Sequence, residues 1–116
     1  MKLKVLGSVS PYVKGKNNCP GYMIEKEETK IILDCGSGIT REINLPDDLK
    51  KLTIIISHLH RDHYADLLTL GYATYVYNKL GLLNEKIKVY FPNNYLADKT
   101  YLESMDEHFF EFITYD

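Results

Sequence analysis

The apolar segment Leu52–Ile56, LTIII, runs directly into the polar segment Ser57–His63, SHLHRDH. The β-branched residues of LTIII predict a strand that is buried on both faces. SHLHRDH holds three of the four histidines of this 116-residue chain. Because ligands in open α/β sheets collect outside the carboxyl ends of strands, this junction predicts an α/β fold with a polar site at the end of one buried strand.

The residue types in SHLHRDH are those of a metal site. Histidine and aspartate are preferred ligands of zinc, and His58 and His60, two residues apart on extended backbone, point to the same side. Asp62 and His63 follow as the chain turns, which directs them toward a second position. Two metals about 3.5–4 Å apart need ligands from neighbouring residues. These four residues are therefore the predicted ligands; the alternative is a solvent-exposed turn.

Asp34 ends a second apolar run, Ile31–Leu33, in a similar setting. Metal-bound histidines commonly donate their other ring N–H to a carboxylate, which fixes the tautomer. We therefore predict that Asp34 supports the histidine cluster without binding the metal itself. The alternative is an aspartate that forms a turn before Gly36.

The remaining pattern predicts a mixed β-sheet with helices on at least one face. An alternating segment at 2–7 and a hairpin of segments 21–25 and 30–33 indicate three antiparallel strands. The other expected strands are 52–56, 87–91 and 108–114. Helices are expected at 39–45, closed by Pro46, at 64–80, ended by Gly81, and at 95–105.

Composition narrows the function classes. A net charge of −2 and a pI near 6.1 argue against a globally basic nucleic-acid binder. No segment reaches the roughly 20 apolar residues that a membrane-spanning helix requires, and the N-terminus lacks a signal-peptide core. Two cysteines are too few for a disulfide scaffold, which favours a reducing, cytoplasmic compartment.

SHLHRDH after LTIII, together with ILDCGSG at 32–38, resembles the metallo-β-lactamase superfamily. NNCPGYMIE at 17–25 is similar to the ribonuclease-Z-like, phosphodiesterase-like branch. The resemblance implies a hydrolase that activates water with one or two zinc ions, or manganese or iron in some members. It implies that His58 and His60 bind the first metal and that Asp62 and His63 bind the second. Asp62 would also be catalytic, orienting the nucleophile.

Two departures from the family pattern matter. The tRNA-processing members usually follow this motif with a Gly-Leu-Pro-Gly-Leu-like segment, whereas this chain reads Tyr64–Leu68, YADLL. We therefore do not expect tRNA processing. Family members are also longer and take further ligands from later motifs. We therefore expect residues 1–116 to form one partial domain, the N-terminal half of an αββα sandwich. His108, in the segment HFFEFIT, is expected to be structural.

These observations predict a metal-dependent hydrolase of phosphodiesters, acting on a nucleic acid or a nucleotide. A thioester or lactam-type hydrolase of the same superfamily is the alternative. A further alternative is a catalytically silent half-domain that self-associates through its unpaired sheet face, since exposed apolar patches mark association surfaces. Because four protein ligands cannot close a two-metal site, we expect weak or single metal occupancy.

Overall fold

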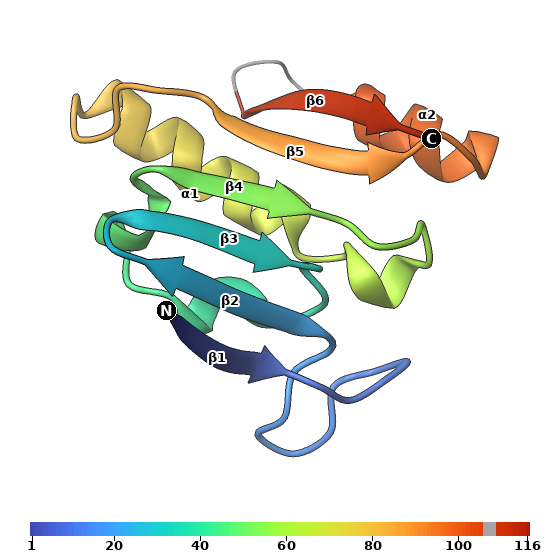
Figure 1. The fold of residues 1–116 in the computed structure, drawn as a ribbon. Coiled ribbons are helices and arrows are strands. Elements are labelled where there is room, and N and C mark those ends of the chain that lie inside the picture. Colours follow the sequence, from blue (N-terminus) through green and yellow to red (C-terminus); the bar gives the residue numbers. More distant parts are fainter. Residues whose placement is uncertain (106–108) are drawn as a thin grey trace.

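The computed structural model describes residues 1–105 and 109–116. Within them the chain forms a six-stranded sheet in the order β1-β2-β3-β4-β5-β6. The first three strands are antiparallel, and β3 to β6 pair in parallel. Figure 1 shows them side by side. Their bounds are β1 Lys2–Gly7, β2 Gly21–Lys26, β3 Thr29–Leu33, β4 Leu52–Ile55, β5 Ile87–Pro92 and β6 Phe110–Tyr115.

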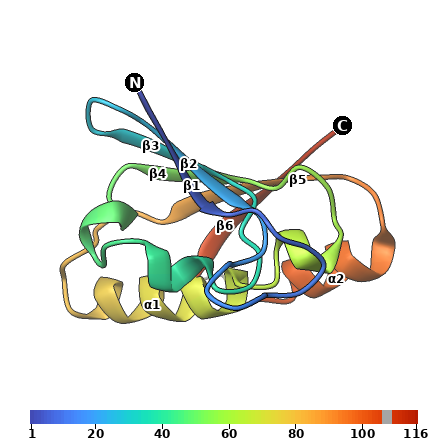
Figure 2. The ribbon, with the colours of Figure 1, turned by 90° about the horizontal axis from the view of Figure 1, so that it is seen from below.

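Two α-helices and three short 3-10 helices connect these strands. The α-helices are α1 Leu67–Lys79 and α2 Leu96–Glu103, and the 3-10 helices are η1 Ile39–Glu42, η2 Asp47–Leu49 and η3 Arg61–His63. Both α-helices lie on the same side of the sheet (Figure 2). None of the described helices combines the length and apolarity needed to cross a bilayer.

The core lies between the sheet and α1. On this side of the sheet, register places Met23, Ile32, Ile54 and Val89 side by side across β2 to β5. They pack in one apolar cluster with residues such as Leu67 and Leu70 of α1. Gly71 of α1 is needed for close packing, because a Cβ there would lie 2.6 Å from the Phe109 ring.

The opposite face of the sheet is only partly covered. Its central row crosses all six strands and is apolar or aromatic throughout: Val5, Tyr22, Leu33, Ile55, Tyr90 and Ile113. Val5 is 58% exposed, and the other five are partly buried. The prediction that LTIII is buried on both faces is therefore wrong for this face, where Thr53 and Ile55 are partly exposed.

The other element predictions are confirmed in type, with some changes of extent. The segment 39–45 contains only the 3-10 turn η1, and η2 follows Pro46. The helix predicted over 64–80 begins at Leu67, because Arg61–His63 forms a separate 3-10 turn, and it ends before Gly81 at φ +75°. The last strand begins at Phe110. His108 lies outside the described residues.

Candidate metal centre

The candidate site lies where β3 and β4 end. These strands are parallel neighbours, with Leu33 beside Ile55, so the residues that follow them meet at one edge of the sheet. The Asp34 backbone N–H continues the ladder by donating to the Ile55 carbonyl at 2.8 Å. The Cys35 N–H donates to the His63 carbonyl at 2.8 Å. Backbone hydrogen bonds thus join the loop after β3 to the loop after β4.

Asp34 is buried, at 6% exposure, and has a φ of +64°. A left-handed backbone is uncommon for a residue other than glycine, and such residues cluster at functional sites. A turn lies at Ser37 and Gly38 but not at Asp34 itself, so the turn proposed as the alternative for Asp34 stays a prediction. The Asp34 carboxylate contacts residues that follow β4.

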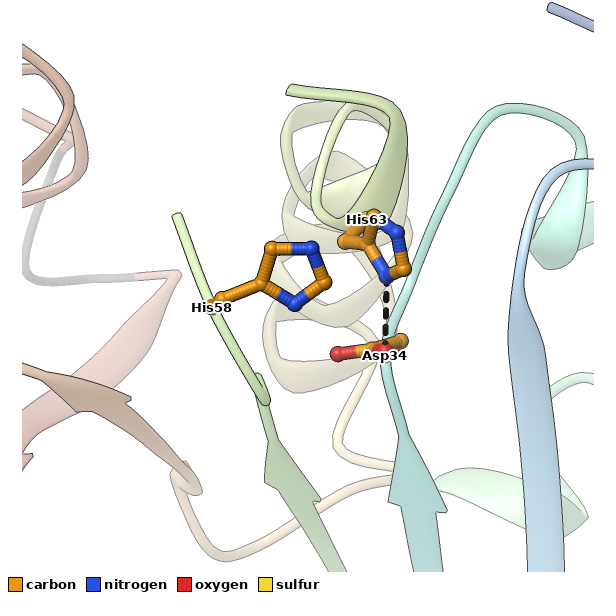
Figure 3. Close-up of side chains that lie close together, drawn as sticks. All are labelled: Asp34, His58 and His63. Atoms are coloured by element: carbon orange, nitrogen blue, oxygen red, sulfur yellow. Dashed lines mark hydrogen bonds and ion pairs between the residues drawn. The ribbon is translucent and has the colours of Figure 1, made fainter. Parts of the chain in front are cut away.

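The Asp34 carboxylate accepts three hydrogen bonds. Oδ1 accepts from the Ser57 backbone N–H at 2.7 Å, and Oδ2 accepts from the Ser57 hydroxyl at 2.8 Å. Oδ2 also accepts from His63 Nδ1 at 2.8 Å, the contact drawn in Figure 3. A carboxylate can only accept, so His63 carries its proton on Nδ1. In the neutral ring, the Nε2 lone pair is then left to bind a metal.

Ser57 extends this arrangement to the second histidine. Its hydroxyl lies 2.9 Å from His58 Nδ1. Because the single hydroxyl proton is donated to Asp34, the oxygen accepts from His58 Nδ1–H. His58 therefore also presents Nε2 as its unprotonated atom. One carboxylate sets the tautomer of both histidines, directly for His63 and through Ser57 for His58.

These side chains form a compact group of potential metal ligands. One ligand atom each from Asp34, His58 and His63 can be chosen so that all three lie within 4.8 Å of one another. The His58 and His63 ring centroids are 3.9 Å apart (Figure 3). Burial, followed by the neighbouring His63 and His60, lowers the pKa of His58. The neutral imidazole that a metal needs is favoured as a result, so the residues present fit a zinc ion.

The other two predicted ligands lie beside this group. His60 is exposed, and its ring centroid is 4.5 Å from that of His58. An oxygen of Asp62 lies 3.5 Å from His63 Nε2. The structure thus brings together His58 and His63, one from each predicted pair of ligands. The division of the four residues between two ions stays a prediction.

Two further residues support the site and were missed by sequence reasoning. Ser57 gave no separate signal, because it precedes the histidines without a metal-binding group. Asp66 stands between the motif and α1, and its carboxylate accepts from the backbone N–H of Gly38 at 3.2 Å and of Thr40 at 2.7 Å. Asp66 thereby holds the loop after Asp34 against the start of α1.

Comparison with protein families identifies the chain. Residues 1–106 match the family described as Anti-Pycsar protein Apyc1. The chain belongs to this family. Among its relatives, the probable metallo-hydrolase YhfI of Bacillus subtilis is 28% identical over 91 residues, which are 78% of this chain and 37% of YhfI. Ribonuclease Z of Saccharolobus solfataricus is 35% identical over 86 residues, 72% of this chain and 27% of that protein.

Solved structures confirm the metallo-β-lactamase fold for this Apyc1-family chain. The crystal structure of the metallo-β-lactamase fold protein YhfI from Bacillus subtilis matches with a TM-score of 0.86 at 22% identity, covering 98% of this chain and 46% of that one. The short form of human tRNase Z matches with a TM-score of 0.69 at 21% identity, covering 100% and 45%. The chain spans less than half the length of these proteins.

Proposed function

We propose that this chain provides the metal-binding part of a hydrolase that cleaves phosphodiester bonds in cyclic nucleotides. The observation that carries the proposal is the Asp34, His58 and His63 group at the carboxyl ends of two adjacent parallel strands. Membership of the Anti-Pycsar Apyc1 family directs the proposal to cyclic nucleotides among the phosphodiesters. The relatives named metallo-hydrolase and ribonuclease Z agree with this reaction class.

Each residue has a proposed role. His58 and His60 bind one zinc ion, and Asp62 and His63 bind a second, with manganese or iron as alternative metals. Zinc bound there supplies Lewis acidity for a phosphoryl group and a lower pKa for water. Asp34 holds His63 by a direct hydrogen bond and His58 through Ser57. Asp62, 17% exposed, accepts a hydrogen bond from the attacking water and so orients it.

The location of the protein is part of the same proposal. Cys19 and Cys35 are free thiols and both are fully buried. Such thiols persist in a reducing compartment, so we place the protein in the cytoplasm.

Zinc titration and a hydrolysis assay test the proposal together. The purified chain is titrated with zinc in a calorimeter and assayed with cyclic nucleotides and with a thioester. His58→Ala and His63→Ala are expected to abolish both zinc binding and hydrolysis. Asp48→Ala, at the opposite end of the strands, is the control and is expected to change neither. Absence of zinc binding, or binding that both histidine variants retain, refutes the metal centre.

The assay with the thioester distinguishes the proposed cyclic-nucleotide hydrolase from the thioester or lactam-type alternative. Turnover of the thioester without turnover of any cyclic nucleotide favours the thioester or lactam-type alternative. Turnover of cyclic nucleotides alone supports the proposal. Zinc binding with no turnover of either favours the catalytically silent half-domain, because the chain spans less than half the length of its solved relatives.

The partly covered sheet face favours self-association as a second function. The row from Val5 to Ile113 is apolar or aromatic on all six strands and has no described helix over it (Figure 2). We expect Ile55→Lys, in the middle of this row, to shift the chain toward monomer in analytical ultracentrifugation. Tyr72→Lys, at an exposed position of α1, is the control. A wild-type chain that sediments as a monomer at all concentrations rejects self-association.

A further inference from the structure

A recess beside the metal centre has no role in the function proposed so far. It has a volume of about 360 Å³ and lies between η3 and α2. Ligand pockets commonly measure about 300–1,000 Å³, so this volume is sufficient for a small ring system. Its lining residues are Arg61, Tyr64, Ala65, Ala97, Asp98 and Tyr101.

The recess is tied to the metal motif through its lining. Arg61 and Tyr64 flank Asp62 and His63 in the chain, so the same short 3-10 helix carries both the predicted ligands and part of the recess wall. Tyr95, the residue before α2, also lies near the motif, because its ring centroid is 5.8 Å from that of His60. The recess and two of the predicted ligands therefore share one short segment of the chain.

The walls suit a flat ring. Tyr64 and Tyr101 both line the recess, with ring centroids 6.2 Å apart, and Ala65 and Ala97 add small side chains to its wall. Tyr95 is 54% exposed and has a φ of +50°. An exposed aromatic side chain on a left-handed backbone next to a metal motif is the kind of strained residue that clusters at functional sites.

The polar groups of the recess suit a neutral ring with N–H donors. The Asp98 side chain is 17% exposed, and Oδ1 accepts from the Tyr64 hydroxyl and from Arg61 Nε at 3.5 Å. Within residues 1–105 and 109–116, both of its hydrogen-bond partners contact Oδ1, so Oδ2 can accept from a ligand. The Arg61 side chain is 82% exposed, which leaves its terminal N–H groups accessible.

We propose that this recess binds the nucleobase of the cyclic nucleotide while the phosphodiester lies at the metal centre. The base stacks on Tyr101, and Asp98 Oδ2 accepts a hydrogen bond from an amino group on the base. Aspartate accepts from base amino groups in the same way in protein–DNA complexes. This inference rests on the proposed function and adds a preference for bases that carry an amino group.

The Asp98 carboxylate favours the base over the phosphate as the part of the substrate that enters the recess. A phosphate placed there would face a carboxylate and be repelled, whereas a neutral base would not. Arg61 contacts Asp98 from the solvent-exposed rim, so its remaining N–H groups can donate to ring or carbonyl acceptors of the base. The anionic part of the substrate is thus left to the metal centre.

The test compares substrates that differ in one exocyclic group and in the protonation of the ring nitrogen beside it. Cyclic AMP and cyclic CMP carry an amino group where cyclic IMP and cyclic UMP carry a carbonyl. The wild-type chain is expected to have a lower KM, or a lower Kd by equilibrium dialysis, for the amino-bearing member of each pair. Asp98→Asn is expected to remove that preference, because an amide can serve the carbonyl as well as the amino group.

Tyr101→Ala tests the stacking without touching the carboxylate. Stacking of a base on an aromatic side chain corresponds to roughly 5- to 150-fold in affinity, and we expect KM and Kd to rise within that range. Zinc affinity is expected to be unchanged, because Tyr101 is not one of the predicted ligands. Tyr72→Ala is the matched control, since it removes an exposed tyrosine of α1 that does not line this recess.

The outcomes separate this inference from the proposed function. If cyclic nucleotides are hydrolysed and KM is the same in wild type, Asp98→Asn and Tyr101→Ala, the recess proposal is overturned and the proposed function stands. If nothing is hydrolysed but nucleotide binding is lost only in the recess variants, the recess proposal stands and the proposed function fails. An equal loss of binding in Tyr72→Ala also overturns the recess proposal, because the effect is then not specific to this site.

Discussion

The two ends of the strand pair β3 and β4 both carry charged side chains, but the side chains are arranged differently. At the amino end, Lys51 contacts Glu28 at 2.5 Å, and these side chains are 60% and 81% exposed. At the carboxyl end, the Asp34 side chain is 9% exposed and accepts from Ser57 and His63. The charges at the amino end pair with each other in solvent. The groups at the carboxyl end are partly buried and point toward one another.

The difference shows that charged residues close together do not by themselves make a site. At the amino end each partner changes the other's pKa: Lys51 lowers that of Glu28, and Glu28 raises that of Lys51. At the carboxyl end, no ion pair within the described residues joins Asp34 or Asp62 to a lysine or arginine. Carboxylates and imidazoles that converge without such a partner are an arrangement that a divalent cation stabilises.

The largest effect is expected from Asp66, which holds the carboxyl-end loop in place. Asp66→Ala removes the acceptor for the Gly38 and Thr40 backbone N–H groups. Hydrogen bonds to charged groups contribute about 1.5–3 kcal/mol, and we expect the free energy of unfolding to fall by an amount in that range. Chemical denaturation measures it. Asp47→Ala, at the exposed amino end, is the control and should change the free energy of unfolding little. An equal loss of stability in the two variants would contradict the difference between the two ends.

The next effect concerns zinc affinity. Asp34→Asn keeps the size of the side chain but replaces one accepting oxygen with a donor, which conflicts with the Ser57 and His63 donors. Loss of such a supporting carboxylate typically costs about 10- to 100-fold in metal affinity. Competition with a chromophoric chelator measures this loss. Asp48→Asn is a matched control, because Asp48 also accepts a backbone N–H, that of Asn44. Unchanged affinity in Asp34→Asn argues against the support role.

A smaller effect is expected from Ser57, which links Asp34 to only one histidine. Ser57→Ala breaks the link to His58 but leaves the Ser57 backbone N–H on Asp34. A neutral hydrogen bond contributes about 0.5–1.5 kcal/mol, so zinc affinity should fall roughly 2- to 10-fold. Ser57→Thr retains the hydroxyl and should retain the affinity. Nitrogen-15 NMR of the metal-free chain checks the cause, because His58 should lose its Nδ1-protonated tautomer only in Ser57→Ala.

The sequence predicted much of the fold because the strands are short apolar runs between clear turns. It did not predict which face of β4 is covered. In LTIII, the residues on both faces are apolar or β-branched, so the sequence shows no alternation of polar and apolar residues. Only the position of α1 makes Ile54 buried and Ile55 partly exposed. The start of α1 at Leu67 was also missed, because Arg61–His63 forms a separate 3-10 turn that the apolar spacing of 64–80 does not reveal.

For the site, the sequence predicted which residues carry metal-binding groups but not how they are connected. The histidine cluster is visible because its members are adjacent in the chain. The link from Asp34 through Ser57 to His58 is not, because it requires β3 and β4 to be neighbours in register, with Leu33 beside Ile55. Ser57 acquires its role from that register alone. The recess between η3 and α2 was not predicted either, because its walls come from two distant segments, with Arg61 and Asp98 37 residues apart.

The smallest effect is expected from Glu28 at the exposed amino end, where the thermal midpoint is measured at different pH and salt concentrations. The pKa of Glu28 is lowered from 4.5, first by the hydrogen bond with Lys51 and then by its charge. A carboxyl group with a lowered folded-state pKa stabilises the fold above its unfolded pKa, and this contribution is lost as pH falls through the folded value. Glu28→Gln should therefore lower the thermal midpoint slightly at pH 7 in low salt. It should change nothing once Glu28 is protonated, or in high salt, which screens exposed pairs. A midpoint shift that persists in high salt would contradict the comparison. It would mean that the Glu28–Lys51 pair is shielded from solvent, as the groups at the carboxyl end are.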